Sequence, residues 1–360
     1  MQIATVVIPN LNGKQYLGPC LDSLTRQSRR DFSVILIDNG SQDGSADFVS
    51  ANYPEVQIRR FDRNEGFCRA VNDGIRMADT PYVILLNNDT VCEDTFIEEL
   101  VRAMDHSWNG AGREHAAQNG ADRNHVLPNC AGQSCVRQDS ASPGRYTSPK
   151  IFSCAAKMVQ MRDPSRMDNA GDFYCALGWA YALGKGKPAS RYDHVREIFS
   201  SCAAAAIYRR EVFDEIGLFD ETHFAYLEDT DVAYRARIAG YRNLYVPSAV
   251  VRHVGSATSG SLYNEFKIRY SSRNNVYLIY KNMPWAQIIL NLPFLVAGFL
   301  IKMIFFAKRG YLREYVLGLG AGAALCRRDK KVRFQWKNLA SYIQIQLELW
   351  GNLFRRLSDM

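Results

Sequence analysis

The stretch YVILLNNDT, from Tyr82 to Thr90, begins as an apolar run and ends on two asparagines and an aspartate. Its first five residues suit a buried strand, because aromatic and β-branched side chains pack well in a sheet. A carboxylate buried near the tip of such a strand costs free energy unless a cation or hydrogen bonds satisfy it. A divalent cation with oxygen ligands is a natural partner for Asp89. The plain alternative is that Asp89 only starts the next helix.

Strand and helix patterns alternate through the first hundred residues. The sequence predicts strands at 3–9, 32–38, 56–61 and 82–88, and helices at 14–28, 45–53, 66–78 and 93–104. Such alternation predicts an α/β fold with a mostly parallel central sheet flanked by helices. Ligands of such sheets bind beyond the carboxyl ends of the strands, where Asp38 and Asp89 both fall. For Asp38 the plain alternative is a polar turn.

The composition is that of a globular protein of 360 residues, enough for one large α/β domain with an appendage, or for two domains. The net charge of +7 is uneven, since thirteen Lys/Arg and only four Asp/Glu follow from Lys281 onward. A basic patch confined to this part favours an anionic lipid surface over a nucleic acid.

Nine scattered cysteines without a CxxC pair argue against a disulfide framework or zinc site and fit a reducing compartment. We read no secretory signal in the first residues.

Two segments depart from this pattern. Residues 106–150 are rich in Gly, Asn and Ser and predict a flexible polar insertion, whose histidines (His106, His115, His125) match no metal spacing. Residues 285–307 are long and apolar enough to cross a bilayer, but they include Asn291 and Pro293. We therefore expect 283–360 to be a basic, apolar and helical region that lies in the membrane interface. A true span, and a soluble packing or dimer face, stay open as alternatives.

A third group of acids lies in FAYLEDTDVAYRARIAGYR, where Glu228, Asp229 and Asp231 begin a predicted helix. Their plain interpretation is stabilisation of the helix dipole. Arg235 and Arg237, further along the same helix, are expected to be solvated.

Six motifs occur in a particular order: VVIPNLNG, LIDNGSQDGS, NEGFCRAVNDGI, YVILLNNDT, FAYLEDTDVAYRARIAGYR and HVGSATSG. Together they resemble the family 2 glycosyltransferases of the GT-A fold, and most closely the rhamnosyltransferase-type branch of bacterial cell-surface polysaccharide synthesis. The resemblance covers roughly residues 3–282 apart from the insertion. It implies a single Rossmann-like nucleotide-binding domain over 1–282.

The resemblance also implies roles for particular residues. Those on the sugar-nucleotide side are Pro9, Asp38, Asn64, Gly66, Asn87 and Asn88, with Asp38 accepting a hydrogen bond from a pyrimidine N3–H. Asp89 is then a metal ligand in a motif whose first acid is replaced by asparagine, and His253 is a second metal or diphosphate contact. Asp229 is the base. The resemblance gives orienting or acceptor-binding roles to Glu228, Asp231 and Arg273. Arg273 would contact a phosphate.

The implied function is an inverting, Mg²⁺- or Mn²⁺-dependent transfer from a nucleoside-diphosphate sugar to a hydroxyl of a lipid-linked saccharide. It is expected at the cytoplasmic face of the plasma membrane. dTDP-rhamnose is favoured as the donor, and UDP-sugars stay open as alternatives. Whether the protein forms a homo-oligomer also stays open. One alternative is a nucleotidyltransferase, which would need a Gly-rich basic loop that IPNLNGKQYL lacks. Another is a non-catalytic sugar-nucleotide-binding protein, against which Asp38, Asp89 and Asp229 together argue.

Overall fold

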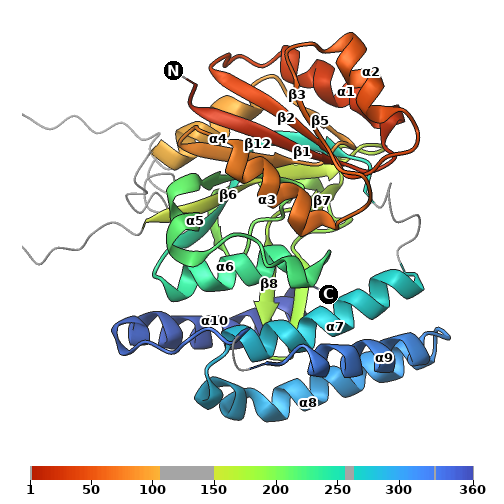
Figure 1. The fold of residues 1–360 in the computed structure, drawn as a ribbon. Helices are drawn as coiled ribbons and strands as arrows, with labels where there is room; N and C mark the ends of the chain where they lie inside the picture. The colour runs from red at the N-terminus through yellow and green to blue at the C-terminus, as the bar shows by residue number, and fades with distance from the viewer. Residues whose placement is uncertain (1, 106–149, 256–262, 328–329, 360) are drawn as a thin grey trace, which may run out of the picture.

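The computed structural model describes residues 2–105, 150–255, 263–327 and 330–359. The predicted insertion, with its three histidines, lies outside the described residues except for Lys150. Figure 1 shows two stacked parts: a sheet with its covering helices above, and a layer of C-terminal helices below.

The central sheet follows the order β10-β12-β6-β11-β4-β1-β2-β3. Its strands are β1 (Ala4–Asn10), β2 (Phe32–Asp38), β3 (Gln57–Arg60), β4 (Tyr82–Leu86), β6 (Ile151–Gln160), β10 (Arg196–Ile198), β11 (Ala205–Arg209) and β12 (Arg242–His253). All of them run in one direction except β10 and β11, which are antiparallel to their neighbours. The predicted mixed α/β class and the first four strands are confirmed.

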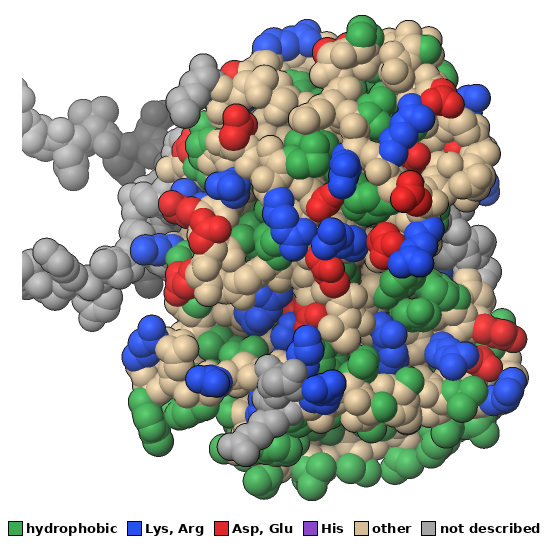
Figure 2. All heavy atoms as spheres, viewed as in Figure 1, with side chains coloured by type: hydrophobic (Ala, Val, Ile, Leu, Met, Phe, Trp, Pro, Cys, Tyr) green, Lys and Arg blue, Asp and Glu red, His purple; other side chains and the backbone are tan. Residues whose placement is uncertain are grey.

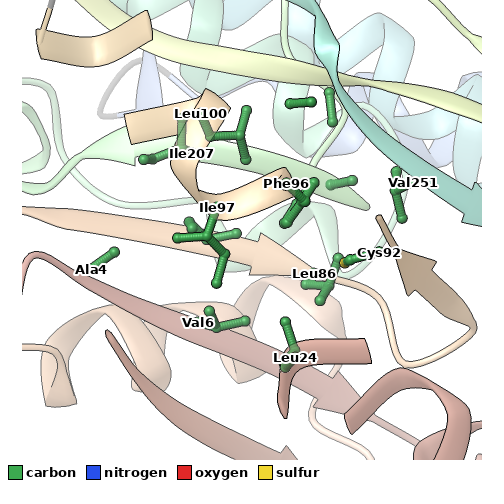
Figure 3. Close-up of a cluster of buried hydrophobic side chains, with 14 of the residues drawn as sticks. Ala4, Val6, Leu24, Leu86, Cys92, Phe96, Ile97, Leu100, Ile207 and Val251 are labelled. Atoms are coloured by element: carbon green, nitrogen blue, oxygen red, sulfur yellow. The ribbon is translucent and has the colours of Figure 1, made fainter. Parts of the chain in front are cut away.

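Helices cover both faces of this sheet, and alternate residues of β4 explain why (Figure 1). The helices are α1 (Lys14–Thr25), α2 (Ser45–Asn52), α3 (Phe67–Met77), α4 (Phe96–Asp105), α5 (Arg210–Ile216) and α6 (Glu228–Ile238). Ile84 and Leu86 belong to one buried cluster, drawn in part in Figure 3, whereas Val83 and Leu85 belong to another. Since side chains alternate along a strand, β4 is buried on both faces, as its apolar run predicts.

The long strand β12 carries a distant histidine to the tip of β4. The runs NLYVP (243–247) and AVVRHVG (249–255) predict two strands, but the structure has one strand with a register shift between Val246 and Val250. Its last residues pair antiparallel with the short strand β5 (Thr90–Cys92), which places His253 opposite Thr90. His253 therefore lies next to Asp89 although more than 160 residues separate them in the chain.

The C-terminal layer consists of α7 (Glu265–Asn282), α8 (Trp285–Ala307), α9 (Leu312–Ala324) and α10 (Leu339–Asp359). Helix α8 presents its polar side to the protein, since Gln287 and Asn291 are buried while Ile289, Leu292 and Ile304 are exposed. Tyr234 Oη donates to Gln287 Oε1, and Asn291 exchanges hydrogen bonds with Gln346 of α10. These contacts explain why so apolar a helix contains Asn291.

Further along, α8 lies directly on the chain that follows strand β8 (Asp172–Cys175). A Cβ at Gly298 would be 2.1 Å from the carbonyl oxygen of Leu177, so only glycine permits this approach. Trp179, in strand β9 (Trp179–Ala182), donates to the Gly298 carbonyl. By length and composition α8 could cross a membrane, which is weak evidence from a single helix. Its contacts with β9, α6 and α10 pack helix α8 against the rest of the protein.

Candidate active site

A cleft of about 1120 Å³ opens at the carboxyl ends of the parallel strands. The predicted site residues that line it are Pro9, Asn64, Asn87, Asn88, Asp89, Glu228, Asp229 and His253. Asp38, Gly66, Asp231 and Arg273 are not among its lining residues. The cleft also includes residues that the sequence reasoning missed, among them Asn10, Asn39, Asp172 and the run 224–227. The first two directly follow predicted site residues at strand ends, so the same strand-end rule could have found them.

Asn10 joins the tips of three strands. Its Nδ2 donates to Asp38 Oδ1 at 3.1 Å, and its Oδ1 accepts from Asn88 Nδ2 at 2.6 Å. All three side chains are buried. The Asp38 carboxylate therefore lies behind the lining residues, and it orients Asn10 and through it Asn88. This network makes the wall of the cleft rigid.

Asn39 ties the end of β2 to the 64–67 turn. Its Nδ2 donates to Asn64 Oδ1 at 3.0 Å and to the Gly66 carbonyl, while its Oδ1 accepts from the Glu65 N–H. Gly66 has φ +89°, and a Cβ there would lie 2.5 Å from the Phe224 ring. The turn therefore needs glycine for its backbone conformation and also for its close packing.

Asp89 and His253 form the part of the cleft that could hold a metal. His253 Nε2 lies 3.3 Å from Asp89 Oδ1, and its Nδ1 lies 2.7 Å from Asp168 Oδ2. Lys185 Nζ in turn lies 3.1 Å from Asp168 Oδ1. Burial alone would lower the pKa of His253, but hydrogen bonds with Asp168 and Asp89 raise it to about 9.

This donor set fits a divalent cation that displaces the proton from His253 Nε2, because histidine binds metals as the neutral imidazole. A histidine ligand whose second ring nitrogen is held by a carboxylate is a recurrent feature of protein metal sites. Asp89 and His253 would be the ligands, and Asp168 would orient the imidazole. Asn87 lines the same cleft and offers an amide oxygen at the motif position where the resemblance implies an acid.

Asp229 lies among acidic neighbours at the start of α6. Its Oδ1 accepts from the Thr230 N–H at 2.6 Å and from Thr230 Oγ1. Ligand atoms of Asp172, Cys202 and Asp229 all lie within 4.8 Å of one another. Burial raises the pKa of Asp229 and also the pKa of Asp172. Asp172 reaches the cleft from the β8–β9 hairpin, which no sequence motif marks.

Glu228 lines the cleft beside Asp229. Burial and then the charge of Asp229 raise the pKa of Glu228 to about 8. Its Oε2 has no hydrogen-bond partner within the described part of the chain. The charge of one of these carboxyls disfavours a charge on the other, and hydrogen bonds from Thr230 favour the charge on Asp229. At neutral pH we therefore assign the proton to Glu228 and the charge to Asp229.

Asp231 and the two arginines of α6 serve the interior instead. Asp231 is fully buried and accepts from Lys281 Nζ at 2.9 Å, from Arg235 and from Asn282. This burial contradicts the predicted acceptor contact of Asp231, whose role is to anchor α6 on α7. The prediction that Arg235 and Arg237 are solvated is also wrong, since they are 9% and 3% exposed. Arg237 donates to the Ile198 carbonyl and pairs with Glu197 and Glu348.

Arg273 is likewise engaged within the protein. Its Nη2 donates to the carbonyls of Thr222 and His223, at 2.8 Å each. The guanidinium also lies over the Tyr270 ring, 4.4 Å from its centroid. These contacts give Arg273 an orienting role within the protein, and its phosphate contact stays a prediction.

Comparison with known proteins shows a family similarity over part of the chain. Residues 5–137 match the model of "Glycosyl transferase family 2". The N-acetylglucosaminyl-diphospho-decaprenol L-rhamnosyltransferase of Mycobacterium tuberculosis is 28% identical over 271 residues, which cover 72% of this chain and 78% of that protein.

Solved structures agree on the fold. Residues 1–349 of TarS from S. aureus, solved in complex with UDP-GlcNAc, match with a TM-score of 0.53 at 14% identity, over 91% of this chain and 82% of that one. GalNAc-T7, solved with UDP, GalNAc and Mn²⁺, matches with a TM-score of 0.52 at 15% identity, over 78% of this chain but only 48% of that one. The predicted GT-A fold is confirmed. The chain is therefore a transferase with a match to glycosyltransferase family 2 over residues 5–137, and it is similar to an L-rhamnosyltransferase.

Proposed function

We propose that this protein transfers a sugar from a nucleoside-diphosphate sugar to a hydroxyl of a lipid-linked saccharide, with inversion. The observation that carries the proposal is one cleft that combines the strand-tip network of Asn10, the Asp89–His253 pair and the half-buried carboxylate of Asp229. The M. tuberculosis relative, named for a diphospho-decaprenol acceptor and L-rhamnose, supports a lipid-linked acceptor and favours dTDP-rhamnose as donor. UDP-sugars are the next candidates.

In this proposal Asp229 accepts the proton of the acceptor hydroxyl as that oxygen attacks the anomeric carbon. The Thr230 N–H and hydroxyl both donate to Oδ1 and so hold the carboxylate in place beside the cleft. Asp229 supplies a single base, and the mechanism uses no covalent carboxylate, which implies one displacement with inversion. Glu228, whose pKa is raised to about 8, would hydrogen-bond acceptor hydroxyls as a neutral acid, and Asp172 lines the cleft beside it.

A divalent cation held by Asp89 and His253 would supply Lewis-acid stabilisation to the departing diphosphate. The chain's own contribution is to place these ligands. The β5–β12 pairing sets the distance between them, and Asp168 holds the imidazole through Nδ1. Asn88, oriented by Asn10, lines the adjoining wall where the nucleotide would lie.

Donor identity is testable by thermal shift. A ligand that binds only the folded state raises its apparent stability, by about 2.7 kcal/mol at a hundred times its Kd. We expect dTDP-rhamnose with Mn²⁺ to raise Tm by several degrees, and UDP-glucose, UDP-galactose and GDP-mannose to raise it less. Equal shifts with ATP and with all sugar nucleotides would contradict a donor site, and a larger shift with a UDP-sugar would reassign the donor.

The C-terminal helices support the membrane part of the proposal. Large apolar side chains are exposed on α8, α9 and α10, among them Ile289, Ile304, Val316, Ile343 and Leu347. Figure 2 shows hydrophobic side chains gathered along the lower edge of the molecule, over α8 and α9, with Lys and Arg just above them. An apolar face bordered by cations suits the interface of an anionic bilayer.

We therefore propose that the α8–α10 face lies on the cytoplasmic surface of an anionic membrane and does not cross it. The polar side of α8 is occupied by the protein through Gln287 and Asn291, so only its apolar side is left for lipid. A lipid-linked acceptor would then be held at the same surface.

Changing Ile289 and Ile304 together to aspartate is expected to weaken binding to anionic vesicles roughly a hundredfold or more, because each buried isoleucine contributes about 1.5–3 kcal/mol. Co-sedimentation with vesicles of phosphatidylglycerol and phosphatidylcholine measures this. Val195→Asp, which alters an exposed apolar residue outside these helices, is the control. Equal recovery of wild type in the supernatant with and without vesicles contradicts the proposal, and a dimer in solution would then assign the face to a second copy.

A further inference from the structure

The segment immediately before the base has an unusual backbone. Phe224, Tyr226 and Leu227 have φ values of 64°, 73° and 66°, in a region that side-chain-bearing residues rarely adopt. At Phe224, with ψ −60°, the Ala225 N–H donates to the His223 carbonyl at 2.7 Å, which makes the rarer, positive-φ form of the γ-turn. We call residues 222–227 the strained loop. Such a conformation persists only where its surroundings impose it.

Those surroundings are two adjacent side chains of α7. Asn274 is fully buried, and its Nδ2 lies 2.9 Å from the His223 carbonyl oxygen and 2.8 Å from those of Ala225 and Tyr226. Arg273 donates to the carbonyls of Thr222 and His223, and its Nε donates to Asn274 Oδ1. The carbonyl groups of the strained loop thus converge on one amide and one guanidinium.

The side chains of the strained loop do not replace this hold. Both ring nitrogens of His223 are buried without a hydrogen-bond partner within the described ranges. The Phe224 ring packs against Gly66, in the 64–67 turn of the cleft. The Phe224 carbonyl also accepts from the Cys68 N–H, and the rings of Phe224 and Tyr226 pack against that of Phe266. Asn274 and Arg273 contact the other four carbonyls named above.

The strained loop leads straight into the site. Residues 224–227 line the cleft, and Leu227 is the residue from which α6 starts, followed at once by Glu228 and Asp229. A shift of this loop would move Asp229 relative to the wall formed by the 64–67 turn. Displacements of about 1 Å at a reacting group can cost roughly a hundredfold in rate.

We propose that Asn274 is a positioning residue for sugar transfer: by holding the carbonyls of the strained loop, its amide sets where Asp229 lies against the bound donor. This role rests on the proposed function, because it assigns the base to Asp229. It assigns Asn274 no contact with substrate.

The test compares Asn274→Ala with Asn275→Ala. Asn275 is the next residue of α7, is equally buried, and accepts a hydrogen bond from Tyr174 Oη rather than from the strained loop. We expect Asn274→Ala to lower kcat roughly a hundredfold with the donor KM within about threefold, and Asn275→Ala to keep kcat within about threefold. If Asn274→Ala does not fold, Arg273→Gln removes the neighbouring carbonyl contacts and is expected to lower kcat in the same sense.

Hydrogen exchange supplies a readout that does not depend on activity. Amide exchange over 222–230 should become faster in Asn274→Ala than in wild type and in Asn275→Ala. Unchanged exchange, or a kcat loss matched by Asn275→Ala, would overturn the positioning role. If exchange rises as expected but the wild type transfers no sugar, Asn274 does hold the loop and it is the proposed function that fails.

Discussion

Asp229→Asn is expected to lower kcat for sugar transfer by roughly a thousandfold, because general-base catalysis contributes about 10² to 10⁴. Asparagine keeps the size of the side chain and can still accept from Thr230, but it cannot take a proton from the acceptor. Nucleotide binding should survive, since the strand-tip network around Asn10 does not involve Asp229. Transfer assays and nucleotide titration by calorimetry measure the two effects separately.

Asp214→Asn is the matched control, because Asp214 is an exposed aspartate on α5. It should leave kcat unchanged.

The pH profile of the wild type gives a second measure of the role of Asp229. Because burial raises the pKa of Asp229, kcat should fall as the pH drops through that raised pKa, above the range of an exposed aspartate. Full activity in Asp229→Asn would remove the base assignment and direct attention to Glu228 or Asp172.

Asp89→Asn is expected to weaken Mn²⁺ binding at least about tenfold to a hundredfold and to lower transfer accordingly. Asp89 is the acidic residue of the NND motif, so its amide variant leaves His253 without an anionic co-ligand from that motif. A thermal-shift titration with Mn²⁺, with and without nucleotide, measures binding independently of transfer. Raising the Mn²⁺ concentration should restore part of the activity.

Asp94→Asn serves as the control for this variant, because Asp94 follows β5 closely but is exposed. Treatment of the wild type with a chelator should reproduce the loss, and added Mg²⁺ or Mn²⁺ should reverse it. Metal-independent transfer by the wild type, at the same rate in chelator, would contradict the cation site at Asp89 and His253.

The order of strands and helices in the first hundred residues could be predicted because its signals are local. Apolar runs such as that of β4, and helical spacing such as that of α4, report which sides of an element must be buried. The strand-tip rule then singled out Asp38 and Asp89 without any knowledge of the partners of these side chains. Asn10 and Asn39, one residue further along their strands, follow the same rule and were missed.

The partners themselves could not be predicted in this way. Asp168 and Asp172 come from a segment without any motif. Asp168 meets His253, and Asp172 reaches the cleft, only because β6 pairs with β12 and then leads into strand β7 (Met167–Asn169) and the β8–β9 hairpin. The burial of Arg235 and Arg237 depends likewise on carbonyls and carboxylates supplied by distant elements. A charged residue in a sequence does not reveal whether a counter-charge will meet it.

In helix α8, too, some features follow from the sequence and others only from the tertiary structure. Its length and apolar character are evident in the sequence, and so is the basic character of the region. That Asn291 and Gln287 face inward, leaving an apolar side outward, follows only from hydrogen bonds with α6 and α10. The local pattern thus sets the elements and the chemistry at their tips, since periodicity is a property of neighbouring residues. The grouping of His253, Asp168 and Asp172 with Asp89 and Asp229 arises from long-range strand pairing, which depends on the whole packed chain.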